Sequence, residues 1–251
     1  MAFRTLSFGD PTTGIWGSAW TVDDGRAVFS LFGDGTAAQP LEPAVALGAP
    51  DDDGPWELSG QGVALRSVPG SETAAVPGGF DQLVRVQGRV AARGSDQAVD
   101  CLGRRGSRDR VALEEFESVR DVVACFEPNQ GLAVLAARPR RASSHADDVL
   151  SASAFEDGHA LLVADPRLST TYLADGLPAR ASFELWPEEP AASQDDSQEE
   201  PQEPRPRRAA GEAIGPRGTS ETEGLTVHAA LFRWHSRGRQ GAGVYVLARA
   251  R

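Results

Sequence analysis

The sequence has no lysine, two isoleucines, one methionine and two cysteines in 251 residues. All 25 basic residues are therefore arginines, and with 36 acidic residues the formal net charge is -11. Nucleic acids and anionic membranes are bound through basic surfaces, so this balance argues against both as partners. The missing lysine fits either GC-rich codon usage or adaptation to high salt, and neither explanation points to a function.

The scarcity of cysteine bears on location. Cys101 and Cys125 have no metal-binding or redox spacing and lie in apolar stretches, which predicts buried, inert, free thiols. A reducing cytoplasm suits so few cysteines. The first residues, MAFRTLSFGDPTTG, lack the apolar centre of a signal peptide, and no apolar run approaches the roughly 18 residues of a membrane helix. We therefore expect a cytoplasmic protein without a membrane span.

Turn signals are abundant. The dipeptide Asp-Gly occurs five times, beginning at Asp24, Asp34, Asp53, Asp157 and Asp175. Asp hydrogen-bonds its own backbone and Gly tolerates positive φ, so Asp-Gly between apolar runs predicts tight hairpins. Roughly fifteen short strands exceed one eight-stranded barrel and predict an all-β fold of two packed antiparallel barrel or sandwich halves. We place the halves at residues 1–115 and 116–251.

The clearest hairpin spans Asp165–Trp186. Its turn is Ala174-Asp175-Gly176, and the residues after it alternate in polarity. One face carries Ala181, Phe183 and Leu185; the other carries Arg180, Ser182, Glu184 and Trp186. Because one face of a barrel strand is internal, one of these two sets lines the barrel.

Less regular stretches separate the strands. Residues 37–54 and 69–79 read as loops, and Val111–Phe116 reads as one helical turn. Glu188–Pro206 (EEPAASQDDSQEEPQEPRP) has seven acidic residues, four prolines and no aromatic residue. Such a segment has too little apolar surface to order itself, so we expect a disordered acidic insertion between two strands.

Several phrases resemble one family. They are Gly103-x-Arg105 at a strand end, Leu168–Tyr172 (LSTTY), Glu184-Leu185-Trp186, and Phe232-Arg233-Trp234. Together they resemble proteins related to carotenoid hydratases and tocopherol cyclases. The resemblance implies two lipocalin-like β-barrel halves and hydration or cyclisation of an isoprenoid or similar lipid. Hydratase-like members carry His-Ser-Trp-Gly after the central Gly-x-Arg, whereas this chain has Gly106–Asp109 (GSRD) there.

Glu184 is the candidate catalytic residue. If its face lines a barrel, the buried carboxylate protonates an alkene or holds the polar end of a ligand, and the former needs a raised pKa. The alternative is an outward polar face.

The candidate ligand-binding residues are Tyr172, Trp186, Arg105 and Trp234. Tyr172 places its hydroxyl at a pocket mouth in the second half. Trp234 belongs either to a ligand platform or to the core, and Arg105 either clamps an anion or pairs charges between the halves.

Metal and cofactor signals are weak. His145 with Asp147 and Asp148 is either the start of a metal or acid–base site or a solvated loop. No H-E-x-x-H or C-x-x-C pattern occurs, so we expect no metal and no cofactor.

Three functions stay open. The first is binding of a small apolar, lipid- or isoprenoid-like ligand in a barrel pocket. The second is an isoprenoid hydratase or cyclase, and the third is a structural or interaction protein whose partner recognises the acidic insertion. An open cavity with a lone carboxylate favours the second, an open cavity without one favours the first, and a filled interior favours the third.

Deletion of Glu188–Pro206 should leave the melting temperature nearly unchanged, because the segment is expected to bury nothing. Thermal unfolding of the deleted and full chains measures this. A drop of many degrees would show that the segment docks on the folded protein.

Overall fold

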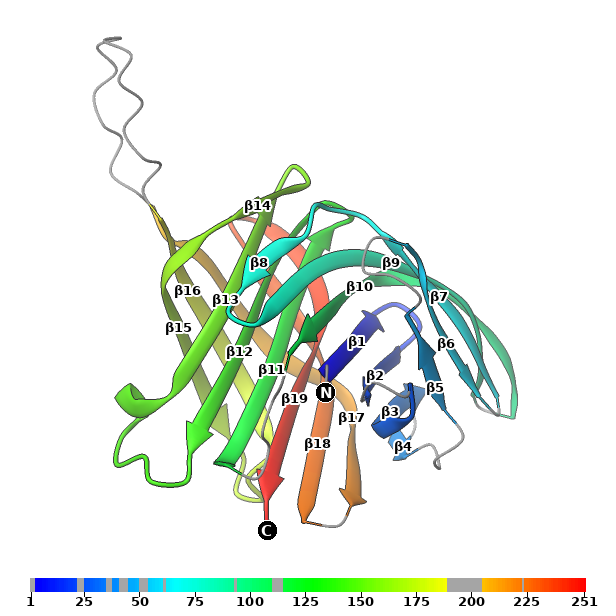
Figure 1. Ribbon diagram of the computed structural model, residues 1–251. Helices are drawn as coiled ribbons and strands as arrows, with labels where there is room; N and C mark the ends of the chain where they lie inside the picture. Colours follow the sequence, from blue (N-terminus) through cyan, green and yellow to red (C-terminus); the bar gives the residue numbers. More distant parts are fainter. Residues whose placement is uncertain are drawn as a thin grey trace, which may run out of the picture.

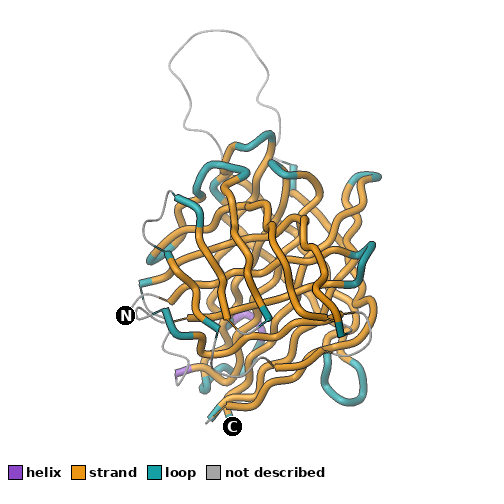
Figure 2. Tube along the Cα trace, turned by 90° about the vertical axis from the view of Figure 1, so that its right-hand side faces the viewer, coloured by secondary structure: helices purple, strands orange, loops and turns teal. Residues whose placement is uncertain are grey.

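The structure, a computed structural model, describes residues 3–21, 25–34, 38–40, 45–49, 54–60, 62–92, 94–109, 115–188, 205–222 and 224–251. Two curled antiparallel sheets pack side by side (Figure 1). Strands make up most of the described trace, and loops join their ends (Figure 2). The predicted all-β fold of two packed barrel-like halves is confirmed.

The first sheet contains the strands before residue 109. They are β1 (Phe3–Asp10), β2 (Ile15–Thr21), β3 (Ala27–Asp34), β4 (Ala38–Pro40), β5 (Ala46–Gly48), β6 (Trp56–Gly60), β7 (Val63–Pro69), β8 (Ala74–Val76), β9 (Gly79–Ala92) and β10 (Ser95–Arg108). Their order is β4-β3-β2-β1-β10-β9-β7-β6-β5, and β8 pairs with β9. The Ala27 amide donates to the Val45 carbonyl at 3.2 Å, and the Leu47 amide donates to the Gly25 carbonyl at 3.0 Å. These bonds nearly close the sheet into a barrel.

The second sheet follows from Phe116. Its strands are β11 (Phe116–Glu127), β12 (Gln130–Pro139), β13 (Val149–Glu156), β14 (His159–Leu161), β15 (Val163–Tyr172), β16 (Pro178–Pro187), β17 (Arg207–Thr222), β18 (Leu225–Ser236) and β19 (Arg239–Ala250); a 3-10 turn, η2, spans His145–Asp147. The order is β14-β13-β12-β11-β19-β18-β17-β16-β15. The two edge strands, β14 and β15, are separated in the chain by Leu162 alone, so the sheet curls until its edges meet. The second sheet begins at Phe116, and the division into domains at 115/116 stays a prediction.

The predicted hairpin is present as β15 and β16. Gly176 has a φ of 79°, and the Asp175 carboxylate accepts the Leu177 amide at 3.0 Å, as the turn chemistry requires. Two loop predictions were wrong in part: β4 and β5 lie within residues 37–54, and β8 lies within 69–79. Strands of three residues are too short to show an alternating pattern, and pairing with β3, β6 and β9 makes them strands.

Two further predictions concern residues that are largely outside the described ranges. The helical turn at Val111–Phe116 is one, although β11 already begins at Phe116. The acidic insertion at Glu188–Pro206 is the other.

Alternation along the strands divides the apolar residues into three main cores. One fills the first barrel, around residues such as Leu6 and Trp56. A second fills the other barrel, and a third lies between the halves, where Trp16 and Trp20 pack with residues such as Leu231. Trp16 and Trp20 thus share a face, and that face lies at the seam between the halves.

A column of aromatic rings occupies the second barrel. Phe183 stacks on Trp234 at 4.7 Å, Trp234 lies 5.4 Å from Phe232, and Phe232 lies 5.3 Å from Tyr245, between ring centroids. Small side chains surround the column, namely Ala124, Ala136, Ala154, Ala181, Ala209 and Ala230. The rings therefore fill this part of the interior, because the alanines leave room for them.

Gly211 should be intolerant of a side chain. It pairs with Trp234 across β17 and β18, and an added Cβ would lie 2.5 Å from the indole. Gly211→Ala should cost about 1–3 kcal/mol of unfolding free energy through overpacking, measured by denaturant unfolding. Gly48→Ala is the matched control, because the nearest atom there is 3.7 Å away. Equal stability of the two variants would contradict the packing of the column.

Candidate functional site

The structure shows which face of β16 lines the barrel. Ala181, Phe183 and Leu185 are buried in the barrel core, and Glu184 and Trp186 lie on the outer face. Glu184 accepts hydrogen bonds from Arg208 at 3.1 Å and from the Trp186 indole at 2.9 Å. Those two bonds lower its pKa, so the carboxylate is held ionised outside the barrel. The geometry thus gives Glu184 no role as a proton donor to a ligand inside.

Two other candidates lie in separate cores. Trp234 is fully buried in the aromatic column. Arg105 is fully buried in the first barrel, where it donates to Gln82 at 2.8 Å and to the Gly54 carbonyl. Its guanidinium lies 4.8 Å from the Trp56 ring centroid. The structure therefore does not bring Arg105, Trp234, Trp186 and Tyr172 together in one site.

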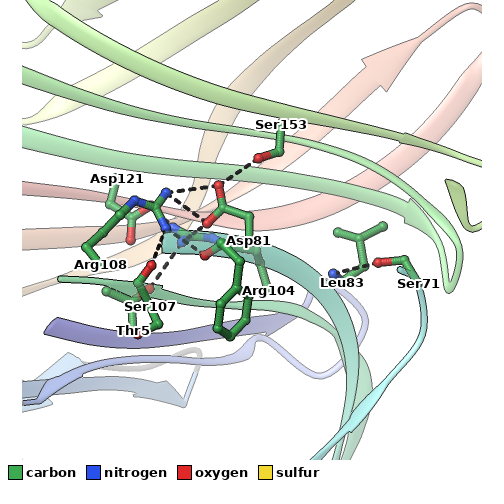
Figure 3. A network of polar contacts seen from close by, with 10 residues as sticks. Thr5, Ser71, Asp81, Leu83, Arg104, Ser107, Arg108, Asp121 and Ser153 are labelled. Carbon is green, nitrogen blue, oxygen red and sulfur yellow. Dashed lines mark hydrogen bonds and ion pairs between the residues drawn. The ribbon is translucent and has the colours of Figure 1, made fainter. Parts of the chain in front are cut away.

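Four charged side chains lie buried at the seam between the halves (Figure 3). Arg104 and Arg108 of β10 converge on Asp81 of β9, with donor–acceptor distances of 2.9 to 3.0 Å. The second half contributes the Ser153 hydroxyl, which donates to Asp81 at 2.7 Å, and Asp121, which accepts from Arg104. Two carboxylates balance two guanidiniums, so the cluster is neutral across the seam.

Burial affects the two carboxyl groups differently. Burial alone would raise the pKa of Asp81, but Arg108, Arg104 and the Ser153 hydroxyl outweigh it and hold that pKa below its ordinary value. Burial raises the pKa of Asp121, because Arg104 compensates it less and its second oxygen has no hydrogen-bond partner among the described residues. Both carboxylates and Arg104 are about 2% exposed, so a small molecule reaches them only if the halves part. We interpret this seam cluster as structural.

A cleft of about 440 Å³ opens at one end of the second barrel. Its lining includes Arg120 of β11, Arg138 of β12, Tyr172 of β15, and Leu247 and Arg249 of β19. Arg120, Arg138 and Arg249 each lie two residues from a barrel-core residue, namely Val122, Ala136 and Leu247. Side chains two apart share a strand face, so the arginines face inward at this end, which we call the arginine mouth.

Tyr172 lies at this mouth with 38% of its surface exposed. Behind it the Thr170 hydroxyl and the Tyr245 hydroxyl are 2.9 Å apart. Burial raises the pKa of Tyr245, so that phenol stays neutral. The Tyr245 ring ends the chain of ring contacts described above.

Ion pairs hold two of the three arginines. Arg120 pairs with Asp148, and Arg138 lies 3.6 Å from Asp148 and 3.5 Å from Glu117. Arg249 differs, because it donates to the Gly176 carbonyl at 3.0 Å and lies 5.8 Å from the Tyr172 ring centroid. No carboxylate pairs with Arg249 among the described residues.

In the loop that contains His145, the side chain of Asp147 is exposed and that of Asp148 is buried. Asp147 is exposed and accepts the Ser143 and Ser144 amides at 2.7 and 2.8 Å, which suits a solvated turn. The side chain of Asp148, in contrast, is only 3% exposed, so the solvated-loop alternative describes Asp147 and does not describe Asp148. Its pairing with Arg120 and Arg138 makes burial tolerable.

The expected absence of a metal stays a prediction, whereas the structure bears on the state of the two cysteines. In the described part of the chain, no three His, Cys, Asp or Glu side chains form a metal-binding group. Cys101 and Cys125 are free thiols, as predicted. Burial raises the pKa of Cys125 to about 12, and it raises that of Cys101 as well, so both are poor nucleophiles.

Comparison with known proteins gives the fold and no more. No protein-family model and no curated protein matches the sequence. Among solved structures, CghA with Sch210972 matches with a TM-score of 0.62 at 11% identity, covering 99% of this chain and 88% of CghA. The AttH candidate NE1406 of Nitrosomonas europaea matches with a TM-score of 0.61 at 10% identity, covering 100% of this chain and 93% of that one. The described residues include no helix with the length and apolar character needed to cross a bilayer.

The seam cluster leads to a comparison of two variants. Asp81→Asn should lower the free energy of unfolding by about 3–5 kcal/mol at pH 7, because it leaves buried guanidiniums uncompensated. Asp121→Asn should cost distinctly less, because burial already opposes ionisation of Asp121 and Arg104 keeps Asp81. Denaturant unfolding measures both, and Asp100→Asn, in the exposed pair with Arg85, should change little.

The pH dependence of the two groups has opposite signs. The contribution of Asp81 to the free energy of unfolding is present above about pH 4. It is lost as the pH falls through the lowered pKa of this carboxyl in the folded state. The contribution of Asp121 to the free energy of unfolding is complete below about pH 4. It is lost as the pH rises through the raised pKa of this carboxyl in the folded state. An Asp121→Asn variant as unstable as Asp81→Asn at pH 7 would contradict this assignment.

Proposed function

We propose that the protein binds a small, largely apolar molecule at the arginine mouth. The observation that carries this proposal is the cleft of about 440 Å³, which is within the usual range of about 300–1,000 Å³ for ligand pockets. Leu247 and the Tyr172 ring supply apolar contact, and Tyr172 also offers a hydroxyl group. CghA, which shares the fold, has been crystallised with the small molecule Sch210972.

The aromatic column argues for a ligand at the mouth rather than deep in the barrel. Phe183, Phe232 and Trp234 are each 2% exposed or less and occupy the space that a deeper ligand would need. A molecule in the cleft would instead lie next to the Thr170–Tyr245 hydrogen bond.

We rank binding above the hydratase or cyclase alternative suggested by the family resemblance. That chemistry needs an acid directed at the ligand, and Glu184 is ionised on the outer face. The carboxylate that lines the cleft, Glu117, is 62% exposed and paired with Arg138. The interaction-protein alternative depends on the acidic insertion and becomes preferred if no ligand binds.

A fluorescence titration tests the proposal. An uncharged apolar probe such as 1-aminoanthracene should bind saturably to the native protein. Tyr172→Ala should weaken binding on the order of tenfold, because it removes a ring from the cleft wall. Leu162→Ala, which truncates a residue that is 58% exposed and does not line the cleft, is the control and should bind normally. The absence of saturable binding, or equal binding by both variants, would overturn the proposal.

A further inference from the structure

We infer that the ligand of the arginine mouth carries a carboxylate group, which Arg249 binds. This inference rests on the proposed binding function and adds the chemical class of the ligand, an apolar acid. Its basis is the charge balance of the cleft, the fixed position of Arg249, and the apolar residues that flank it.

The charge balance leaves one cation in excess. Arg120 and Arg138 are matched by Asp148 and Glu117, both of which lie in ion-pair distance. Arg249 adds a third guanidinium without a carboxylate among the described residues. An arginine stays charged at all physiological pH values, so the mouth carries a local positive charge on a chain of net charge -11.

Two contacts hold Arg249 in place, and a glycine leaves room for it. Its Nη2 donates to the Gly176 carbonyl at 3.0 Å, and its guanidinium lies over the Tyr172 ring. At Gly176 an added Cβ would lie 2.9 Å from Arg249 Nη1, so a glycine at this turn gives the guanidinium its space. A guanidinium has five N–H donors, and a planar group held this way is suited to a two-point hydrogen bond with a carboxylate.

Apolar surface adjoins this cation. Leu247 lines the cleft, and Leu173, next to Tyr172, is 42% exposed. Within the cleft, Leu247 and the Tyr172 ring are apolar groups beside the Arg249 guanidinium, whose centre lies 5.8 Å from the ring centroid. The combination matches a molecule with one acidic group and an apolar body.

A matched pair of ligands tests the inference. Decanoate and decanol share a chain length, and both are titrated below the concentrations at which they aggregate, by displacement of 1-aminoanthracene. Decanoate should bind on the order of tenfold or more tightly than decanol, and its affinity should fall with added salt. Arg249→Met should reduce decanoate binding to the level of decanol and leave decanol unchanged.

The controls separate this inference from the proposed function. Arg251→Met removes a nearby exposed arginine paired with Glu221 and should bind both ligands as the native protein does. Equal binding of decanoate and decanol by the native protein would overturn the inference and leave the binding function intact. If neither ligand nor probe binds, both fail. If far-UV circular dichroism shows that Arg249→Met is unfolded, the native protein alone tests the inference, through its preference for decanoate over decanol and the salt dependence of that preference. A preference for decanoate that added salt does not weaken would also overturn the inference.

Discussion

The two halves of this protein depend on a neutral group of buried charges. Asp81 of the first half is the centre, because Arg104, Arg108 and Ser153 all donate to it. Removing such charges from water is costly, and the cost is recovered only when each one has a partner in good geometry. The partners come from both sheets, so the arrangement is complete only when the halves are docked in one relative position. Apolar packing around Trp16 and Trp20 adds area to the seam but is less directional.

Buried side chains occupy the interiors of both barrels, and this limits where a ligand can bind. The first barrel buries Arg105 against Trp56, and the second is filled by its aromatic column. The inward-facing positions at one end of the second barrel are polar instead, since Arg120, Arg138 and Arg249 continue the faces that carry Val122, Ala136 and Leu247 deeper inside. A binding function at this end therefore requires no cavity in the core and no loss of packing there.

The sequence supported the fold better than the site. Alternation along residues 179–186 and the turn at Gly176 predicted the β15–β16 hairpin correctly, because both signals are local. The expectation that Tyr172 lies at the mouth of a ligand pocket came from the same hairpin and stays a prediction. The alternation showed that Glu184 and Phe183 lie on opposite faces, but a barrel that binds a ligand can have a polar interior, so it did not show which face is inside.

The arginines of the mouth were missed for a different reason. Arg120 and Arg138 come from the consecutive strands β11 and β12, but Arg249 comes from β19, more than 100 residues later, and they are three of 25 arginines. The available signal was their spacing of two residues from apolar neighbours, which many surface arginines share. Their convergence depends on sheet order and register, which are long-range properties. Asp148 was misjudged likewise, because its partners Arg120 and Arg138 are supplied by other strands.

The closure of the two sheets also bears on how the protein behaves in a crowded solution. An open sheet presents unpaired amide and carbonyl groups along its outer strands, and these recruit strands from other molecules. In the second sheet the outer strands β14 and β15 are joined through Leu162, and the Glu188 amide donates to the Leu162 carbonyl at 2.9 Å. In the first sheet, hydrogen bonds between residues 25–27 and 45–47 likewise pair backbone groups of β3 and β5 that would otherwise lie at open edges. A molecule built almost wholly of strands thereby limits the edges at which copies of it would aggregate.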